Sequence, residues 1–230
     1  STLVRSVDDI EALTPEGAAP QISMGSSEVR GHWRTLVSAS RRLASRPFGE
    51  TASPLVTGME RWAEHEEKQA RLELEGKDIA IEEKASGVLR GALTHLVRNA
   101  LVHGLERPEE RVAQGKESWG VVTVRCSEHP HFCIEVRDDG RGVDVAALCE
   151  RASAQGLAVV KGQELDLLFC HGLSTRGYTD ELAGRGVGLD AVRSSLAQVG
   201  LCIHVRSEPG RGTCFTIEAP AERAQAATGT

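Results

Sequence analysis

The stretch Asp138-Asp-Gly-Arg-Gly142 follows a run over residues 132–136 in which apolar and polar residues alternate. Alternation of this kind predicts a half-buried strand that ends at Asp138. A carboxylate at a strand end can accept a hydrogen bond from an exocyclic amine such as that of adenine. Gly140 and Gly142 would let the backbone approach the base, where any Cβ would intrude. An ordinary Asp-Gly turn gives the same pattern, so this stretch alone leaves both interpretations open.

A second glycine box, Gly184-Arg-Gly-Val-Gly188, immediately precedes a segment that predicts an amphipathic helix over residues 187–199. Backbone N–H groups freed by glycines at a helix N-terminus form a binding site for phosphates. The polar segment 172–180, which precedes this box, is long enough to close over a ligand. An ordinary surface loop has the same composition, and the later turn Gly210-Arg-Gly-Thr213 can equally be a plain hairpin turn.

The third motif lies on a helix predicted over residues 84–104, where His95, Asn99 and His103 recur every four residues. This spacing stacks the three side chains on one face, away from the apolar stripe. An amide oxygen can complete the octahedral shell of Mg²⁺, which often takes few protein ligands beside phosphates. A solvated polar face would have the same pattern. None of the three motifs decides alone, but together they favour a nucleotide pocket.

Length and charge narrow the class of protein. With 230 residues, the chain is long enough for one domain and a helical appendage. Its net charge of −6 argues against a nucleic-acid-binding domain, which is usually basic. We see no long apolar run and no signal-peptide core, so we expect a cytoplasmic protein without membrane insertion. The six cysteines form no Cys-x-x-Cys pair, which favours buried, reduced thiols over disulfides or a zinc site.

The expected elements group into helices and hairpins. We predict helices over 27–46, 54–68, 84–104, 144–155, 163–169 and 187–199, and strands over 71–75, 121–127, 132–138, 202–207 and 213–219. Because the elements are grouped and do not alternate as in a Rossmann fold, the order favours an α+β fold, in which helices cover a sheet in a two-layer sandwich.

Taken in this order, the motifs resemble the histidine-kinase-like ATPases, which share the Bergerat fold with gyrase B, MutL and the heat-shock chaperones. The resemblance narrows to the CheA chemotaxis kinases through an insert, His103-Gly-Leu-Glu-Arg-Pro-Glu-Glu-Arg111, that is followed by Gly115-Lys116. Further matching motifs lie at residues 138–144, 169–175 and 184–190. The resemblance covers residues 53–220.

This resemblance implies a site for ATP and Mg²⁺. Asn99 would ligate Mg²⁺, Asp138 would hold adenine, and His95 and His103 would approach the phosphates, with His95 and Asn99 as the catalytic pair. The other nucleotide-binding positions that it implies are Arg98, Gly140, Gly142, Ser174, Thr175, Gly184, Arg185, Gly186, Val187, Gly188 and Thr213. Residues 157–186 would form a lid over the nucleotide.

Three positions depart from the pattern of these kinases. Val102 stands where Asp is usual, Ala183 where Ser is usual, and Leu173 where Phe is usual. These changes spare the adenine and metal ligands, but Val102 and Ala183 leave the catalytic rate open. They keep a second hypothesis in play, a nucleotide-binding pseudokinase that serves as a scaffold. A DNA ATPase of the gyrase or MutL type is disfavoured by the acidic charge and by the insert.

The resemblance also predicts how the chain is organised. We expect a flexible leader over 1–26, a helical segment over 27–52 in place of a full dimerisation hairpin, the ATPase domain over 53–220 and a tail over 221–230. Such a domain would transfer the γ-phosphoryl group of ATP to a histidine of a phosphotransfer domain in trans. A response regulator and a CheW-like coupling protein would be further partners. The short helical segment predicts a monomer or weak dimer, and His32 is a weak candidate for a phosphoacceptor.

Overall fold

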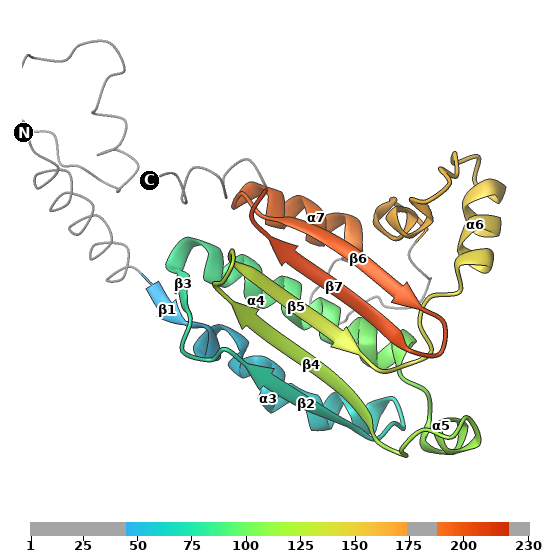
Figure 1. Ribbon diagram of the computed structural model, residues 1–230, viewed down its shortest axis with the longest axis horizontal. Coiled ribbons are helices and arrows are strands. Elements are labelled where there is room, and N and C mark those ends of the chain that lie inside the picture. The colour runs from blue at the N-terminus through green and yellow to red at the C-terminus, as the bar shows by residue number, and fades with distance from the viewer. Residues whose placement is uncertain (1–44, 174–187, 221–230) are drawn as a thin grey trace, which may run out of the picture.

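The computed structural model describes residues 45–173 and 188–220. In this part of the chain a five-stranded sheet, in the order β2-β4-β5-β7-β6, packs one face against the helices α3, α4 and α7 (Figure 1). The strands are β2 (Ala70–Glu75), β4 (Gly120–Ser127), β5 (Cys133–Asp138), β6 (Cys202–Glu208) and β7 (Gly212–Glu218). The helices are α3 (Phe48–His65), α4 (Glu83–Asn99) and α7 (Leu189–Gln198). The predicted α+β class, a two-layer sandwich of helices on a sheet, is confirmed.

Both predicted hairpins are present as antiparallel pairs. Val124 of β4 lies opposite Val136 of β5, and Val205 of β6 lies opposite Phe215 of β7. β7 also pairs antiparallel with β5, so the two hairpins join within the sheet. In this sheet only β2 runs parallel to its neighbour, β4, because the chain between the two strands returns through α4.

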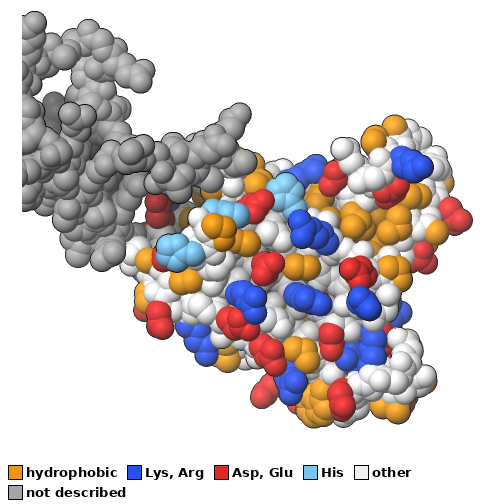
Figure 2. All heavy atoms as spheres, viewed as in Figure 1, with side chains coloured by type: hydrophobic (Ala, Val, Ile, Leu, Met, Phe, Trp, Pro, Cys, Tyr) orange, Lys and Arg blue, Asp and Glu red, His pale blue; other side chains and the backbone are white. Residues whose placement is uncertain are grey.

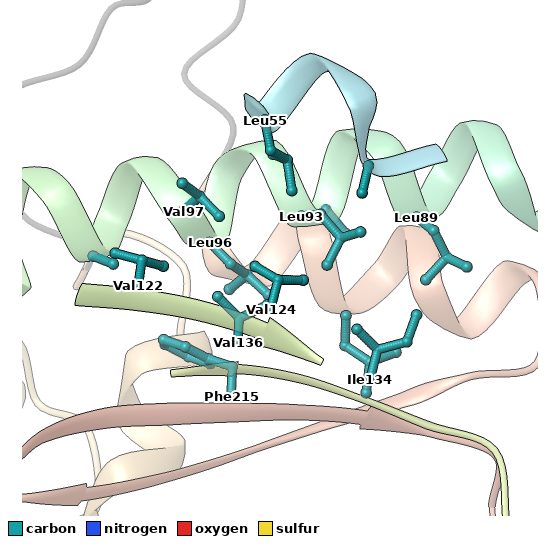
Figure 3. Packing of buried hydrophobic residues seen from close by; sticks show 14 of the residues in the cluster. Leu55, Leu89, Leu93, Leu96, Val97, Val122, Val124, Ile134, Val136 and Phe215 are labelled. Carbon is teal, nitrogen blue, oxygen red and sulfur yellow. The ribbon is translucent and has the colours of Figure 1, made fainter. Parts of the chain in front are cut away.

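Alternation along the strands places one face of the sheet in the core. Ile134 and Val136 of β5 and Phe215 of β7 are buried, and they point toward the side of α4 that carries Leu93 and Leu96 (Figure 3). The residues between them on each strand are polar, charged or cysteine, and they form the outer face of the sheet. Figure 1 presents this outer face to the viewer, with the helices behind it.

The helix predicted over residues 84–104 is confirmed, with a change of winding near its end. α4 is followed directly by one π-helical turn, η1 (Ala100–Gly104). The Lys68 ammonium group donates hydrogen bonds to the carbonyls of Leu101, at 2.5 Å, and Val102, at 2.8 Å. Because the last carbonyls of a helix have no intrahelical donor, Lys68 stabilises this wide turn. Turns of this kind are frequent at functional sites.

The start of the described chain corrects the prediction. A helix is predicted over residues 27–46, but Ser45–Pro47 forms strand β1, which pairs antiparallel with β3 (Ala80–Glu82). Residues 27–44 lie outside the described residues. The boundary predicted between residues 52 and 53 falls inside α3, which shares one core with the sheet.

α3 begins at Phe48, six residues before the predicted start at Pro54. The Phe48 side chain is fully buried and its N–H donates to the carbonyl of Ile79 at 2.7 Å, so packing fixes the first turn. Pro54 therefore lies inside the helix, where it cannot donate to the carbonyl of Glu50. The Ser53 hydroxyl donates to that carbonyl at 2.9 Å and replaces the missing bond.

Three short elements complete the surroundings of the site. α6 (Val145–Ala154) and η2 (Glu164–Phe169) lie close to their predicted ranges, whereas α5 (Pro108–Ala113) was not predicted. A second, smaller core between α6 and η2 consists of Leu148, Ala152, Leu167 and Leu173. Among the described helices we find none with both the length and the apolar character that a membrane span requires.

Candidate nucleotide-binding site

Asp138 is the last residue of β5 and lies on the core face of the sheet, with 4% of its surface exposed. Its Oδ1 atom accepts hydrogen bonds from the backbone N–H groups of Gly140, at 2.9 Å, and Thr213, at 3.3 Å. Oδ2 accepts none from the described residues, yet no fully buried side-chain oxygen among them lacks a partner. Oδ2 therefore reaches the surface of the site, where it can accept a hydrogen bond from a ligand.

Three glycines surround this carboxylate. A Cβ at Gly104 would lie 2.9 Å from Oδ1 of Asp138, and one at Gly212 would lie 2.0 Å from the Asp138 carbonyl oxygen. A Cβ at Gly140 would lie 2.1 Å from the carbonyl oxygen of Gly104. Distances this short are not tolerated, so each position requires glycine for the backbone to approach so closely. Gly104 and Gly212 were not predicted as site residues.

The environment of Asp138 changes its acidity. Burial raises the pKa of its carboxyl to about 6, because water no longer solvates the charge. The hydrogen bonds from Gly140 and Thr213 act in the opposite direction, while the charges of Asp139 and Glu106 add to the rise in pKa. At neutral pH the group is mostly ionised, and a poorly solvated carboxylate is a strong hydrogen-bond acceptor.

The insert between η1 and β4 places a cluster of ion pairs beside the loop that follows Asp138. Arg111, only 1% exposed, donates to the Glu106 carboxylate at 3.2 Å and to the Asp139 carboxylate at 2.8 and 3.2 Å. Lys116 donates to the other oxygen of Glu106 at 2.8 Å. Two cations therefore offset two carboxylates. Arg111 and Glu106 are fully buried and depend on these partners, whereas the Asp139 side chain is 43% exposed.

The same cluster holds the backbone that carries Asp138. Lys116 donates to the carbonyls of Asp139, at 3.0 Å, and Gly140, at 2.8 Å. Asp139 in turn accepts a hydrogen bond from the N–H of Val121 at 2.9 Å. The cluster thus fixes the loop from two sides. Sequence reasoning missed this role; the available signal was the density of acidic and basic residues over 106–116.

The predicted phosphate and metal residues lie on the adjoining helix. His95 and Asn99 are half-buried on the last turns of α4, and His103 is exposed on η1. Gly104, at the end of η1, joins this trio to the carboxylate described above. Neighbouring protein atoms partly desolvate the His103 ring and lower its pKa, and the charge of Lys68 lowers it further. His103 is therefore neutral at physiological pH.

Four other residues that were predicted to bind the nucleotide lie within the described part of the chain: Arg98, Gly142, Gly188 and Thr213. Thr213 contributes its N–H to Asp138, as given above, and Arg98 lies over the Trp62 ring, 6.0 Å from its centroid. Gly142 has a φ of +74°, and a Cβ there would lie 2.4 Å from the carbonyl oxygen of Glu208. The absence of a Cβ at Gly142 therefore allows the loop after Asp138 to contact the backbone at the end of β6.

Gly188 precedes α7, and its carbonyl accepts hydrogen bonds from the N–H groups of Ala191 and Val192 at 3.1 and 3.2 Å. The helix begins at Leu189, two residues later than predicted. The remaining predicted positions, Ser174, Thr175, Gly184, Arg185, Gly186 and Val187, lie outside the described residues, as does the part of the predicted lid from 174 onward.

Residues 86–223, more than half of the chain, match the family model described as "Histidine kinase-, DNA gyrase B-, and HSP90-like ATPase". The chain belongs to this ATPase family. The matched range includes Asp138, Asn99 and the second glycine box. An ATP-binding domain of the histidine kinase type is therefore present.

Two curated chemotaxis proteins CheA are similar to this ATPase chain. The one from Cereibacter sphaeroides is 36% identical over 181 residues, which are 74% of this chain and 26% of that protein. The one from Rhizobium meliloti is 32% identical over 205 residues, 86% of this chain and 27% of that protein. The chain thus spans about a quarter of these relatives. The predicted resemblance to CheA-type kinases is confirmed.

Among solved structures, the histidine kinase domain of a blue-light activated histidine kinase from Erythrobacter litoralis has a TM-score of 0.47 and 16% sequence identity with this chain. The match covers 80% of this chain and 66% of that one.

Proposed function

We propose that this domain is the ATP-binding kinase domain of a CheA-like chemosensory histidine kinase. It would transfer the γ-phosphoryl group of ATP to a histidine of a phosphotransfer domain in trans. The observation that carries the proposal is Asp138, a buried carboxylate with one oxygen held by two backbone N–H groups and the other available at the surface. Adenine offers the exocyclic N–H that such an oxygen needs, and the surrounding glycines let the backbone pack closely enough to hold the carboxylate in place.

The phosphates would lie beside the end of α4. Asn99 forms no side-chain hydrogen bond with the described residues, so its amide oxygen is available as a hard, neutral ligand that fits Mg²⁺. Bound there, the ion would offset the negative charge of the phosphates. Gly188 at the start of α7 and the neutral His103 ring would add uncharged phosphate contacts, and His95 would act with Asn99 in the transfer step.

In the transfer itself, a nitrogen of the acceptor imidazole attacks the γ-phosphorus. A nitrogen–phosphorus bond forms while the bond from that phosphorus to the terminal oxygen of ADP breaks, which yields phosphohistidine and ADP. The contribution of the domain is position and electrostatic stabilisation, as in other phosphoryl transfers. The phosphoryl group would pass on to a response regulator, and a CheW-like protein would couple the kinase to a receptor.

The proposal is tested by mixing the chain with Mg²⁺, radiolabelled ATP and a separate phosphotransfer domain. We expect label on the added domain, and we expect Asn99→Ala to remove most of it. Arg90→Ala, an exposed change on the same helix, is the matched control and should leave transfer unchanged. Transfer that is equal in all three proteins would contradict the role of Asn99.

The second candidate is a nucleotide-binding pseudokinase that serves as a scaffold. It is favoured by one observation: Val102 stands where these kinases usually have Asp, and its carbonyl is bound by Lys68. Tight ATP binding with no label on any phosphotransfer domain would support the scaffold and contradict the kinase. In either case we propose that the chain alone is a monomer or a weak dimer.

A further inference from the structure

The outer face of the sheet carries a cluster of metal-binding side chains at the end where β6 begins and β7 ends. Cys202 lies directly opposite Glu218 across the β6–β7 pair, and His204 follows on the same face two residues later. The Cys202 sulfur, one ring nitrogen of His204 and one carboxylate oxygen of Glu218 all lie within 4.8 Å of one another. Figure 2 shows histidine side chains gathered over this end of the sheet.

A fourth side chain converges on the same carboxylate. Nε2 of His204 lies 3.5 Å from Oε1 of Glu218, and Nε2 of His131 lies 3.2 Å from Oε2. The Cys202 thiol donates to the Glu218 backbone carbonyl at 3.2 Å. Cys202 and Glu218 are half-buried and His204 is exposed, so the site is anchored in the sheet yet open to solvent.

These side chains match the ligand preferences of zinc. Thiolate, imidazole and carboxylate are the three ligand types of protein zinc sites, with bonds of about 2.0–2.3 Å and tetrahedral geometry. Two ligand atoms at the corners of such a tetrahedron lie roughly 3.3–3.8 Å apart. The His204–Glu218 separation of 3.5 Å already fits that spacing. The sulfur lies within 4.8 Å of both other ligand atoms, and the strand pairing holds the backbones of Cys202 and Glu218 opposite each other while the side chains can rotate.

We propose that Cys202, His204 and Glu218 bind one Zn²⁺ on the outer face of the sheet. The thiol loses its proton to solvent as the sulfur–zinc bond forms. His131 holds the second oxygen of Glu218 and so orients this ligand, a role that outer partners commonly have in metal sites. A water molecule completes the coordination.

The proposed zinc site is separate from the nucleotide site. Thr213, which donates to Asp138, and Glu218 lie at opposite ends of β7, five residues and about 17 Å apart along the strand. The Glu218 side chain also points to the outer face, whereas Asp138 lies on the core face. The zinc site therefore does not depend on the proposed kinase activity.

The test uses the reduced chain, freed of metal, and two probes. Titration with Co²⁺ should produce one equivalent of a thiolate-to-cobalt charge-transfer band, and calorimetry with Zn²⁺ should show one site. Cys202→Ser should abolish the band, and His204→Ala should weaken Zn²⁺ binding at least tenfold. His131→Ala should weaken it about tenfold, as loss of an outer partner does.

Two matched controls separate this site from other thiols and imidazoles. Cys214→Ser changes a thiol near the other end of β7, and His171→Ala changes an exposed histidine paired with Asp190. Both should bind Zn²⁺ like the unmodified chain. The proposal is overturned if no stoichiometric binding occurs, or if Cys202→Ser binds Zn²⁺ and Co²⁺ as the unmodified chain does while circular dichroism shows that both are folded.

Discussion

The two ends of β7 each place a carboxylate beside the strand, but they hold it in different ways. At the Thr213 end, Asp138 is 4% exposed and is fixed by backbone N–H groups and by glycines. At the other end, the Glu218 side chain is 29% exposed and its partners are the side chains of His131 and His204.

This difference determines which substitutions each end of the strand can tolerate. A site built from backbone groups survives the loss of many neighbouring side chains, but it cannot accept an added Cβ. A site built from side chains on a regular sheet has room for larger residues, but it loses its donors one substitution at a time. The first arrangement suits a ligand that approaches one fixed acceptor oxygen, whereas the second suits an ion that binds several side chains.

The largest expected effect concerns the ion cluster that supports the Asp138 end. Arg111→Met should lower the free energy of unfolding by about 3–5 kcal/mol, because it removes the buried cation that Glu106 and Asp139 share and leaves the buried Glu106 with Lys116 alone. Urea denaturation measures this. Arg141→Met, which breaks an exposed pair with Glu110, is the control and should cost less than about 1 kcal/mol. Equal costs would mean that the buried cluster contributes no more than a surface pair.

Gly140→Ala should have the next largest effect, on the pocket itself. The added Cβ would lie 2.1 Å from the Gly104 carbonyl oxygen, and relieving such a clash costs about 1–3 kcal/mol. We expect weaker ADP binding together with a lower melting temperature. Gly91→Ala, where nothing lies near the added Cβ, is the control and should stabilise the helix slightly. A Gly140→Ala protein with unchanged ADP affinity would contradict the close approach.

A smaller effect should appear as a pH dependence of nucleotide affinity. The pKa of Asp138 is about 6 without ligand, and adenine requires the carboxylate form. Affinity should therefore be level above pH 7 and fall as pH decreases through 6, to about one-tenth at pH 5. Asp138→Asn should remove this slope, whereas Glu218→Gln should keep it. A slope that persists in Asp138→Asn would assign the titration to another group.

The same raised pKa has a consequence for stability. Between the ordinary value of 3.8 and about 6, the folded chain binds more protons at Asp138 than the unfolded chain does. The contribution of Asp138 to the free energy of unfolding therefore decreases as pH rises through this range.

Much of the fold follows from local patterns in the sequence. The alternation in β5 and β7 and the long apolar stripe of α4 predicted their elements, because burial of one face dictates such periods. The start of α3 was missed because proline is usually read as a helix start, whereas here packing of Phe48 and the Ser53 hydroxyl place Pro54 inside. The pairing of β1 with β3, which lie more than thirty residues apart in the chain, has no comparable signal.

The candidate site was predictable only in part. Asp138, Gly140 and Asn99 are marked by local motifs, although their roles stay predictions. Gly104 and Gly212 come from distant segments, and their closeness to Asp138 is a consequence of tertiary packing that no spacing reveals. The cysteines were expected to be buried, but only Cys126 is fully so, and the cluster around Glu218 depends on strand register.

The most direct test of the nucleotide site is calorimetry of ADP binding to the unmodified chain and to Asp138→Ala at pH 7.5 with Mg²⁺. The account predicts that the unmodified chain binds and that the variant loses about 1.5–3 kcal/mol, roughly 10- to 150-fold in Kd, because a hydrogen bond to a buried charged group is removed. Asp78→Ala, which removes an exposed carboxylate, should bind as the unmodified chain does. Unchanged affinity in a folded Asp138→Ala protein would contradict the assignment of the pocket.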